Sequence, residues 1–332
     1  MRATGLGSLP GTDMPAALGM ALGTGSPWLP ELPARGPGAG MIGRTTAVLE
    51  GLGADLQPQG WRLIDGSGAD HARARSTLRH DLDDLEEAAQ GHAGPVRVTM
   101  SGPWTMAACV ERPRGDRVLA DHGLRRELAE SLGIGFADLL AELGRRLPEV
   151  SFTAQLDEPS LPAVLAGRVP TASGFSRHRS VDVPMAVDLL ARVVQPVKAV
   201  VDEVTMHCCA PGLDLDVPDK AGVHVLALPT ANLSAAQWDQ LGPWLESGRR
   251  LALGVADTPV PDQLPGADAV VARVLRIARP LGLDPAVWVE KVDLSPDCGL
   301  AGWSELGAGR LLEQLERAAE LLPEQLTRCQ PG

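Results

Sequence analysis

The sequence predicts a single (β/α)8 barrel, an α/β fold, extending over residues 1–332 as one domain. Short apolar runs alternate with longer segments of helical periodicity along the whole chain, which is typical of βα units on a parallel sheet. Eight such runs can be counted. A doubly wound open sheet is the alternative, but the first run lacks the G-x-G-x-x-G phosphate turn that usually follows the first strand of that fold.

The expected elements are defined by their periodicity. The expected strands are residues 3–6, 60–64, 96–100, 151–156, 199–206, 223–228, 251–255 and 289–294. Apolar residues at three- and four-residue spacing predict helices over 125–147, 185–194, 234–246, 267–279 and 306–322. The Pro/Gly-rich segment 25–40 and the polar segment 171–182 are too long for simple connections, and we expect both to be loops over the C-terminal mouth of the barrel.

Composition restricts the class of partner. The net charge is −12, which repels phosphate backbones and anionic headgroups, so nucleic acid and membrane surfaces are not expected and a small molecule fits better. No apolar run approaches the roughly 20 residues of a membrane span, and the start lacks the apolar core of a signal peptide, so we expect a cytoplasmic protein. The 5 cysteines do not resemble a secreted disulfide framework.

Potential metal ligands follow two expected strands. His207 and Cys209 are two residues apart at the end of an extended segment, so their side chains point to one side and Cys208 points to the other. Cys298 follows the eighth strand, and in a barrel all strand ends border one mouth. One imidazole and two thiolates are typical zinc ligands, and three protein ligands leave one position open. The sequence therefore predicts a zinc site of His207, Cys209 and Cys298 where a small thiol is activated for alkylation.

A structural interpretation of these residues is the alternative. In that interpretation His207 is a core histidine and the cysteines are small buried hydrophobic residues. Three ligand types at strand ends on one face favour the metal site. Cys109 and Cys329 lie on an expected helix and in the C-terminal tail, and we expect them to be structural.

Two further strand ends carry polar groups. Asp157 and Glu158 follow the fourth strand, where a carboxylate could bind the ammonium group of an amino acid, although carboxylates also stabilise helix N-termini. Gly7 and Ser8 follow the first strand, where backbone N–H groups and a hydroxyl could bind a carboxylate. A simple tight turn explains the glycines equally well.

Five motifs together resemble, in the same order, those of the C-terminal barrel of cobalamin-independent methionine synthase. They are Gly5-Leu6-Gly7-Ser8-Leu9-Pro10, Gly102-Pro103-Trp104-Thr105, Gln155-Leu156-Asp157-Glu158-Pro159, His207-Cys208-Cys209 and Pro296-Asp297-Cys298-Gly299-Leu300. The resemblance implies a zinc-dependent methyltransferase with homocysteine as acceptor. It places zinc on His207, Cys209 and Cys298.

The resemblance also implies a substrate site. Ser8 would hold the carboxylate of homocysteine and Asp157 its amino group, with Gly7, Trp104 and Glu158 in the same site. Uroporphyrinogen decarboxylases and corrinoid-dependent methyltransferases are related barrels, and the zinc motif separates this chain from them.

The chain departs from the family pattern at two strand ends. The family's zinc glutamate belongs at the end of the sixth strand, where this chain has Ala227 and Leu228, so we expect only three protein ligands on zinc. After the seventh strand the family has Asp-x-His, whereas Asp257 is followed here by Thr258 and Pro259. We expect Asp257 to be the remaining catalytic residue of that motif.

A third departure concerns the methyl donor. The full-length enzymes carry a second, N-terminal barrel that helps to bind folate, and this chain has no room for one. The expected donor is therefore methylfolate, a methyl-corrinoid or a separate donor protein. A non-catalytic barrel that retains an amino-acid or thiol pocket is the second hypothesis, and a cofactor-free decarboxylase is the third.

Overall fold

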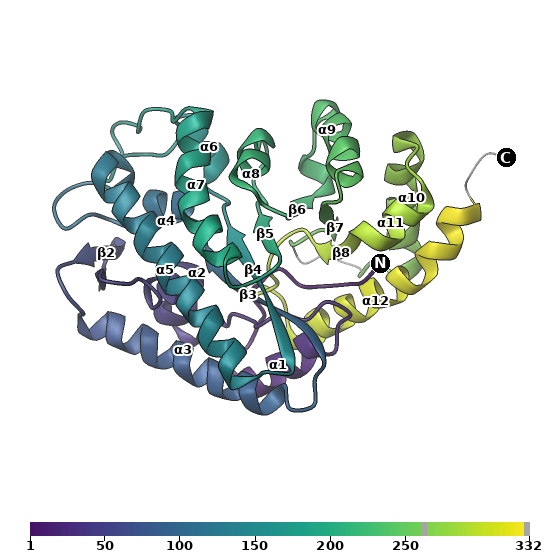
Figure 1. Cartoon of the computed structure of the whole chain (residues 1–332), viewed down its shortest axis with the longest axis horizontal. Coiled ribbons are helices and arrows are strands. Elements are labelled where there is room, and N and C mark those ends of the chain that lie inside the picture. The colour runs from purple at the N-terminus through teal and green to yellow at the C-terminus, as the bar shows by residue number, and fades with distance from the viewer. Residues whose placement is uncertain (260–263, 329–332) are drawn as a thin grey trace.

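The computed structural model describes residues 1–259 and 264–328. Its centre is a curled parallel sheet of six strands in the order β3-β4-β5-β6-β7-β8, with helices around its outer face (Figure 1). The strands are β3 (Gly94–Ser101), β4 (Val150–Asp157), β5 (Val204–His207), β6 (Val225–Pro229), β7 (Arg250–Ala256) and β8 (Val292–Pro296). Because all six strands are parallel, their carboxyl ends lie at the same edge of the sheet.

Two N-terminal segments lie along the outer strands of this sheet. Ala3 forms a parallel bridge with Leu294 of β8, and Trp28 forms one with Arg97 of β3. The two segments also contact each other, since the N–H of Ser26 donates to the carbonyl of Ala3 at 3.0 Å. The expected first strand therefore lies beside the eighth, although it forms isolated bridges rather than a regular strand.

The expected second strand forms with the expected bounds, but it is not part of the central sheet. Residues 60–64 form β2 (Gly60–Ile64), which pairs antiparallel with β1 (Gly53–Gln57) in a separate two-stranded sheet. The two strands are joined by a two-residue turn, so local pairing is satisfied without the central sheet. The segment around Trp28, which we expected to be only a loop, contacts β3 instead.

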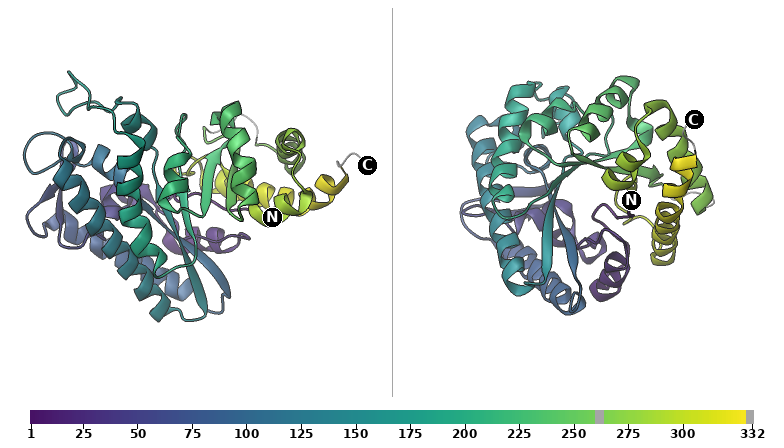
Figure 2. Two further views of the ribbon diagram at one scale, coloured as in Figure 1. Left: turned by 45° about the horizontal axis from the view of Figure 1, so that its top comes forward. Right: turned by 45° about the vertical axis from the view of Figure 1, so that its right-hand side comes forward.

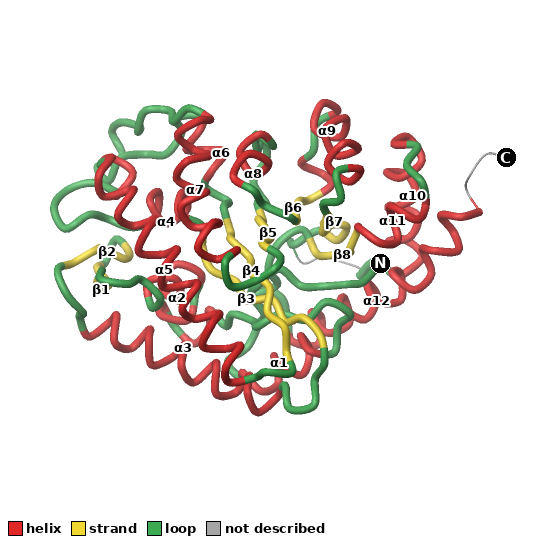
Figure 3. The backbone as a smooth tube through the Cα atoms, viewed as in Figure 1, coloured by secondary structure: helices red, strands yellow, loops and turns green. Residues whose placement is uncertain are grey.

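The expected helices are confirmed, with shifted ends. The α-helices are α1 (Met14–Leu22), α2 (Met41–Thr46), α3 (Ala69–Ala88), α4 (Pro103–Cys109), α5 (His122–Arg146), α6 (Leu161–Leu165), α7 (Val183–Lys198), α8 (Asp216–Ala221), α9 (Ala235–Glu246), α10 (Ala267–Leu281), α11 (Pro285–Lys291) and α12 (Glu305–Arg328). The longer ones surround the sheet (Figures 2 and 3). Residues 171–182 form a loop before α7, as expected.

Two strands are shorter than the sequence indicates. Helix α7 and the turn after it occupy the chain up to residue 203, so β5 covers only the end of the expected strand 199–206. Helix α11 takes residues 285–291, and β8 consequently begins and ends later than expected. The predicted zinc ligands still lie at the ends of both strands: His207 is the last residue of β5, and Cys298 follows the end of β8 by two residues.

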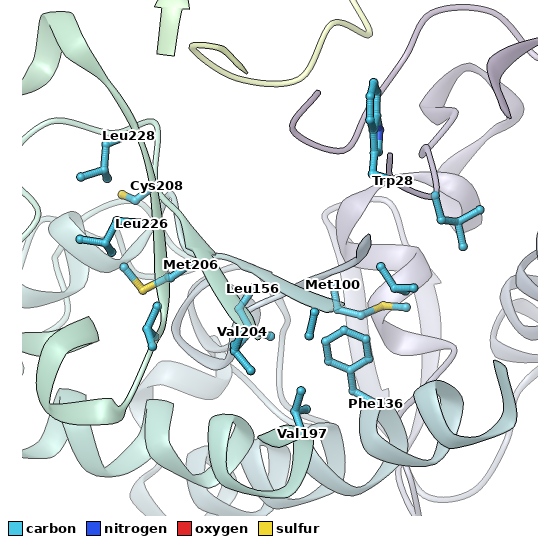
Figure 4. Packing of buried hydrophobic residues seen from close by; sticks show 14 of the residues in the cluster. Trp28, Met100, Phe136, Leu156, Val197, Val204, Met206, Cys208, Leu226 and Leu228 are labelled. Atoms are coloured by element: carbon cyan, nitrogen blue, oxygen red, sulfur yellow. The ribbon is translucent and has the colours of Figure 1, made fainter. Parts of the chain in front are cut away.

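The main core lies between the sheet and the helices. Figure 4 shows Phe136 of α5 and Val197 of α7 packed against side chains of the central strands, including Leu156 and Val204. This layer fixes the outer face of β4 and β5 and therefore the direction of the residues that follow them.

Among residues 1–259 and 264–328, every helix is too short or too polar to cross a membrane.

Candidate functional site

The end of β5 separates its side chains as the sequence predicts. His207 is the last residue of β5 and aligns with Asp157 of β4 and Ala227 of β6. Cys208 belongs to the hydrophobic core, beside Leu228 in Figure 4, and burial raises the pKa of its thiol to about 12. Cys208 therefore has a packing role, and its two neighbours are available to the mouth.

His207, Cys209 and Cys298 converge, although they come from different strands. Their ligand atoms all lie within 4.8 Å of one another, and this is the one such group of three His, Cys, Asp or Glu residues in the described part of the chain. Ligand atoms around tetrahedral zinc are about 3.3 to 3.8 Å apart for bonds of about 2.0 to 2.3 Å. Small side-chain movements would therefore close the group around an ion.

The imidazole of His207 has the arrangement of a metal ligand. The side chain is 2% exposed, and Nδ1 lies 3.0 Å from the carbonyl oxygen of Ala227. A proton on Nδ1 then donates to this carbonyl, which leaves a lone pair on Nε2. Nε2 is buried and has no hydrogen-bond partner in the protein. A carbonyl that fixes the tautomer and the ring is the usual outer support of a zinc histidine.

The two thiols interact with each other. A hydrogen bond with Cys298 lowers the pKa of Cys209, whereas the same hydrogen bond and burial raise the pKa of Cys298. Both thiols are half-buried, so they reach the mouth while β5 and β8 hold their backbones.

A second group of polar side chains surrounds Gly7. Gly7 has φ +95, and a Cβ built on it would lie 3.9 Å from Oδ2 of Asp157 and 4.0 Å from Oε2 of Glu31. Asp157 is 5% exposed, and Gln155 donates to its Oδ1 at 2.7 Å. Burial raises the pKa of Asp157, while the charge of His207 opposes that shift. Two buried carboxylates therefore face the same turn.

Sequence reasoning missed Glu31. It is 3% exposed, its Oε1 has no hydrogen-bond partner, and burial raises its pKa to about 8. Glu31 reaches the site because its segment bridges Ser8 in parallel. The sequence signal for Glu31 is its position as the single acidic residue in the apolar stretch 28–32. This stretch lies in a segment that the sequence predicts to be a loop.

Ser8 connects the amino-terminal turn to the loop that carries Cys298. The N–H of Leu300 donates to the carbonyl of Ser8 at 2.7 Å, and a Cβ built on Gly299 would lie 2.1 Å from the Ser8 hydroxyl oxygen. Only glycine permits this close approach. The Ser8 turn and the zinc-ligand loop therefore pack directly on each other.

Two predicted substrate residues are engaged in internal contacts. The carboxylate of Glu158 accepts hydrogen bonds from the N–H groups of Trp104 and Thr105 at 2.9 and 2.7 Å and from the Thr105 hydroxyl at 2.8 Å. The Trp104 indole N–H donates to the carbonyl of Ala186 in α7 at 3.0 Å. Glu158 therefore stabilises the start of α4, and Trp104 joins α4 to α7. Because the polar atoms of both side chains are engaged within the protein, we do not include these residues in the substrate site.

Comparison with known proteins places the chain in a family. Residues 100–320 match the model of the cobalamin-independent synthase catalytic domain. The chain belongs to the cobalamin-independent methionine synthase family. It is accordingly an enzyme of the methyltransferase class.

A solved methionine synthase structure has the same fold. A B12-independent methionine synthase from Shewanella sp. W3-18-1, in complex with selenomethionine, is 14% identical with a TM-score of 0.60, and the match covers 98% of both chains. The exo-beta-1,4-mannosidase Op5Man5 from Opitutaceae bacterium strain TAV5 is 13% identical with a TM-score of 0.46, covering 99% of this chain and 60% of that one. No curated protein matches the sequence.

The departures from the methionine synthase pattern are visible at two strand ends. Ala227 is 0% exposed and packs with Leu6 and Ala252, and Leu228 is 2% exposed, so β6 brings no carboxylate to the zinc-ligand cluster. After β7, Asp257 is paired with Arg273 at 3.1 Å and its side chain is 66% exposed.

Asp257 also contacts the loop that carries Cys298. Burial raises the pKa of Asp297 in this loop to about 6, and the negative charge of Asp257 nearby contributes to the increase. Asp257, the predicted catalytic aspartate, thus lies beside the loop that carries Cys298, and its carboxylate forms an ion pair with Arg273.

Proposed function

We propose that this protein transfers a methyl group to the thiol of homocysteine in a zinc-dependent reaction. The convergence of His207, Cys209 and Cys298 carries the proposal, because soft sulfur and imidazole ligands at an open mouth suit zinc and a substrate thiol. The buried, unpartnered Nε2 of His207 fits a metal ligand and has no other partner in the protein.

The three ligands would hold zinc with one position open. Bound zinc supplies positive charge that lowers the pKa of a thiol, so that the thiol is nucleophilic at neutral pH. The carbonyl of Ala227 keeps the proton on Nδ1 of His207, and the Cys209 and Cys298 thiols give up their protons to become ligands.

Asp157 and Glu31 would bind the ammonium group of homocysteine. Burial of two ionised carboxylates at one turn raises the free energy of the protein unless a cation balances their charge. The ammonium group of an amino acid supplies such a cation. Ser8 and the N–H groups around Gly7 would bind the substrate carboxylate. Because the Ser8 turn packs on Gly299, next to Cys298, a substrate bound at this turn would have its thiol within reach of the zinc-ligand cluster.

The donor is proposed to be methylfolate, a methyl-corrinoid or a donor protein. Asp257 lies at the mouth beside Asp297 and is our candidate for assisting the donor side of the reaction. No nucleic-acid or membrane partner is proposed.

We also propose that the chain forms one (β/α)8 barrel domain. The bridges of Ala3 with Leu294, Trp28 with Arg97 and Ser8 with Glu31 support closure of the sheet by the two N-terminal segments. In such a barrel the seventh and eighth positions would be filled by residues near 3–9 and 27–31.

Metal analysis and a methyl-transfer assay test the function. Protein purified without chelators should contain about one zinc ion per chain and should methylate homocysteine with methyltetrahydrofolate or methylcobalamin as donor. Cys298→Ser should lose both properties, whereas Cys109→Ser, at a half-buried cysteine outside the cluster, should keep both. Bound zinc with no turnover from either donor would favour the non-catalytic binding protein instead.

A further inference from the structure

The segment that carries Glu31 is held by a buried arginine. Arg44 of α2 is 2% exposed, and its Nη1 donates to the carbonyl of Pro30 at 2.8 Å. Pro30 immediately precedes Glu31. The guanidinium is therefore hydrogen-bonded to the peptide group that links Pro30 to Glu31.

A buried aspartate holds this arginine in turn. Asp81 of α3 is 2% exposed, and its Oδ2 lies 3.8 Å from Nη1 of Arg44. The other oxygen of Asp81 pairs with Arg35, which follows Glu31 by four residues. Asp81 thus binds two arginines, Arg35 and Arg44, that both follow Glu31 in the chain.

This group combines two acidic and two basic residues. Glu31 and Asp81 are acidic, Arg35 and Arg44 are basic, and three of the four side chains are almost completely buried. A buried charge is tolerated when it is paired and hydrogen-bonded, and removal of one partner leaves the other uncompensated. The positive charge of Arg44 also opposes the pKa increase that burial imposes on Glu31.

We infer that Arg44, held by Asp81, is a positioning residue: it fixes the Pro30–Glu31 peptide so that the Glu31 carboxylate stands beside Asp157 at the ammonium site. This inference rests on the proposed function. It assigns to the α2–α3 pair the selectivity for an amino group, because the network acts on the peptide that carries Glu31 and includes none of the zinc ligands.

The test compares two ligands that differ only in the amino group. Zinc-loaded protein is titrated calorimetrically with L-methionine and with 4-(methylthio)butanoate, which lacks the ammonium. The wild type should prefer methionine. In Arg44→Met this preference should fall about tenfold, as expected for loss of hydrogen bonds to a charged group, with affinity for 4-(methylthio)butanoate unchanged.

Two further variants of the network and one control variant complete the design. Arg44→Lys should restore part of the preference, and Asp81→Asn should lower it, so the inference stays testable if Arg44→Met does not fold. Arg62→Met is the control, because Arg62 pairs with Asp55 at 2.7 Å in the β1–β2 hairpin, outside this network, and is more exposed than Arg44. It should leave the preference unchanged.

The outcomes separate this inference from the proposed function. Equal loss of both ligands in Arg44→Met and Asp81→Asn would show a merely structural role, and an unchanged preference would show no role in positioning. Either result overturns the inference and leaves the proposed function standing. A zinc-loaded wild type that binds neither ligand overturns both.

Discussion

Nδ1 of His207 lies 3.0 Å from the carbonyl oxygen of Ala227, the residue that aligns with it on the neighbouring strand β6. Strand β6 thus contributes to the proposed zinc site through its backbone and not through a side chain. The side chain of Ala227 faces Leu6 and Ala252, on the opposite side of the strand from Leu228, which packs in the main core. Ala227 is therefore the inward-facing position of β6 that aligns with His207, and a carboxylate there would point toward the zinc-ligand cluster.

Ala227→Glu should increase zinc affinity, because a fourth, negatively charged ligand compensates more of the charge of the ion. The same charge should make a bound thiol less acidic, so methyl transfer should change as well. Equilibrium competition with a chromogenic chelator measures the affinity. Ala227→Gln is the matched control: both variants should lose about 1 to 3 kcal/mol of stability through overpacking, but the glutamine should not raise zinc affinity. Equal zinc affinity in the two variants would contradict the proposal that zinc has three protein ligands and that its open coordination position faces Ala227.

Asp157→Asn and Glu158→Gln should have opposite phenotypes although the residues are adjacent. Asp157 faces Gly7, so its substitution should weaken methionine binding about tenfold or more and leave zinc content intact. Glu158 accepts three hydrogen bonds at the start of α4, so its substitution should cost about 1 to 3 kcal/mol of unfolding free energy and leave methionine affinity nearly unchanged. Chemical denaturation and calorimetry measure the two quantities. Loss of zinc and fold in Asp157→Asn would instead give Asp157 a structural role.

Gly299→Ala should disturb the contact between the zinc-ligand loop and the Ser8 turn. The added methyl group would lie 2.1 Å from the Ser8 hydroxyl but 3.2 Å from the Ser8 Cβ, so removal of the hydroxyl relieves most of the overlap. We expect Gly299→Ala to lower stability by about 1 to 3 kcal/mol and to reduce zinc content. The double variant Ser8→Ala/Gly299→Ala should recover much of both, as measured by thermal unfolding and metal analysis. Additive losses in the double variant would show that the two loops are not in direct contact.

The sequence predicted the residues whose position depends on strand periodicity. His207, Cys208 and Cys209 follow the alternation of an extended chain, and Cys298 follows a strand that ends at the same edge. The first relationship is local and the second follows from parallel topology. Both predictions therefore hold although the expected bounds of β5 and β8 differ from the observed ones by several residues.

Glu31 and its network could not be predicted in the same way. The segment around Trp28 forms single bridges and has no alternating pattern, so nothing local distinguishes it from a loop. The pattern of residues 60–64 fits a central strand as well as it fits a hairpin strand. Only the pairing with residues 53–57 distinguishes the two. The contacts of Glu158 and Trp104 depend on where α4 and α7 pack, which is a tertiary property.

Binding of methionine should release a proton through Glu31. Burial raises the pKa of this carboxyl to about 8, so in the ligand-free protein it is mostly protonated at pH 7. An ammonium group beside it favours the ionised form, and binding must then expel the proton to solvent. Affinity should accordingly increase from about pH 6 to about pH 8. The folded-state pKa is raised above the unfolded value, so the contribution of Glu31 to stability of the ligand-free protein is complete at low pH and is lost as pH rises through about 8.

Calorimetry at pH 7 in phosphate and in Tris measures this proton, because the two buffers differ in ionisation enthalpy and the difference in binding enthalpy counts the protons released. The zinc-loaded wild type should release a substantial fraction of one proton per methionine bound, and Glu31→Gln should release much less. The decline of stability toward pH 8 should also be smaller in Glu31→Gln than in the wild type. Equal proton release by the two proteins would mean that Glu31 does not meet the ammonium group, and that Asp157 alone provides the negative charge of the site.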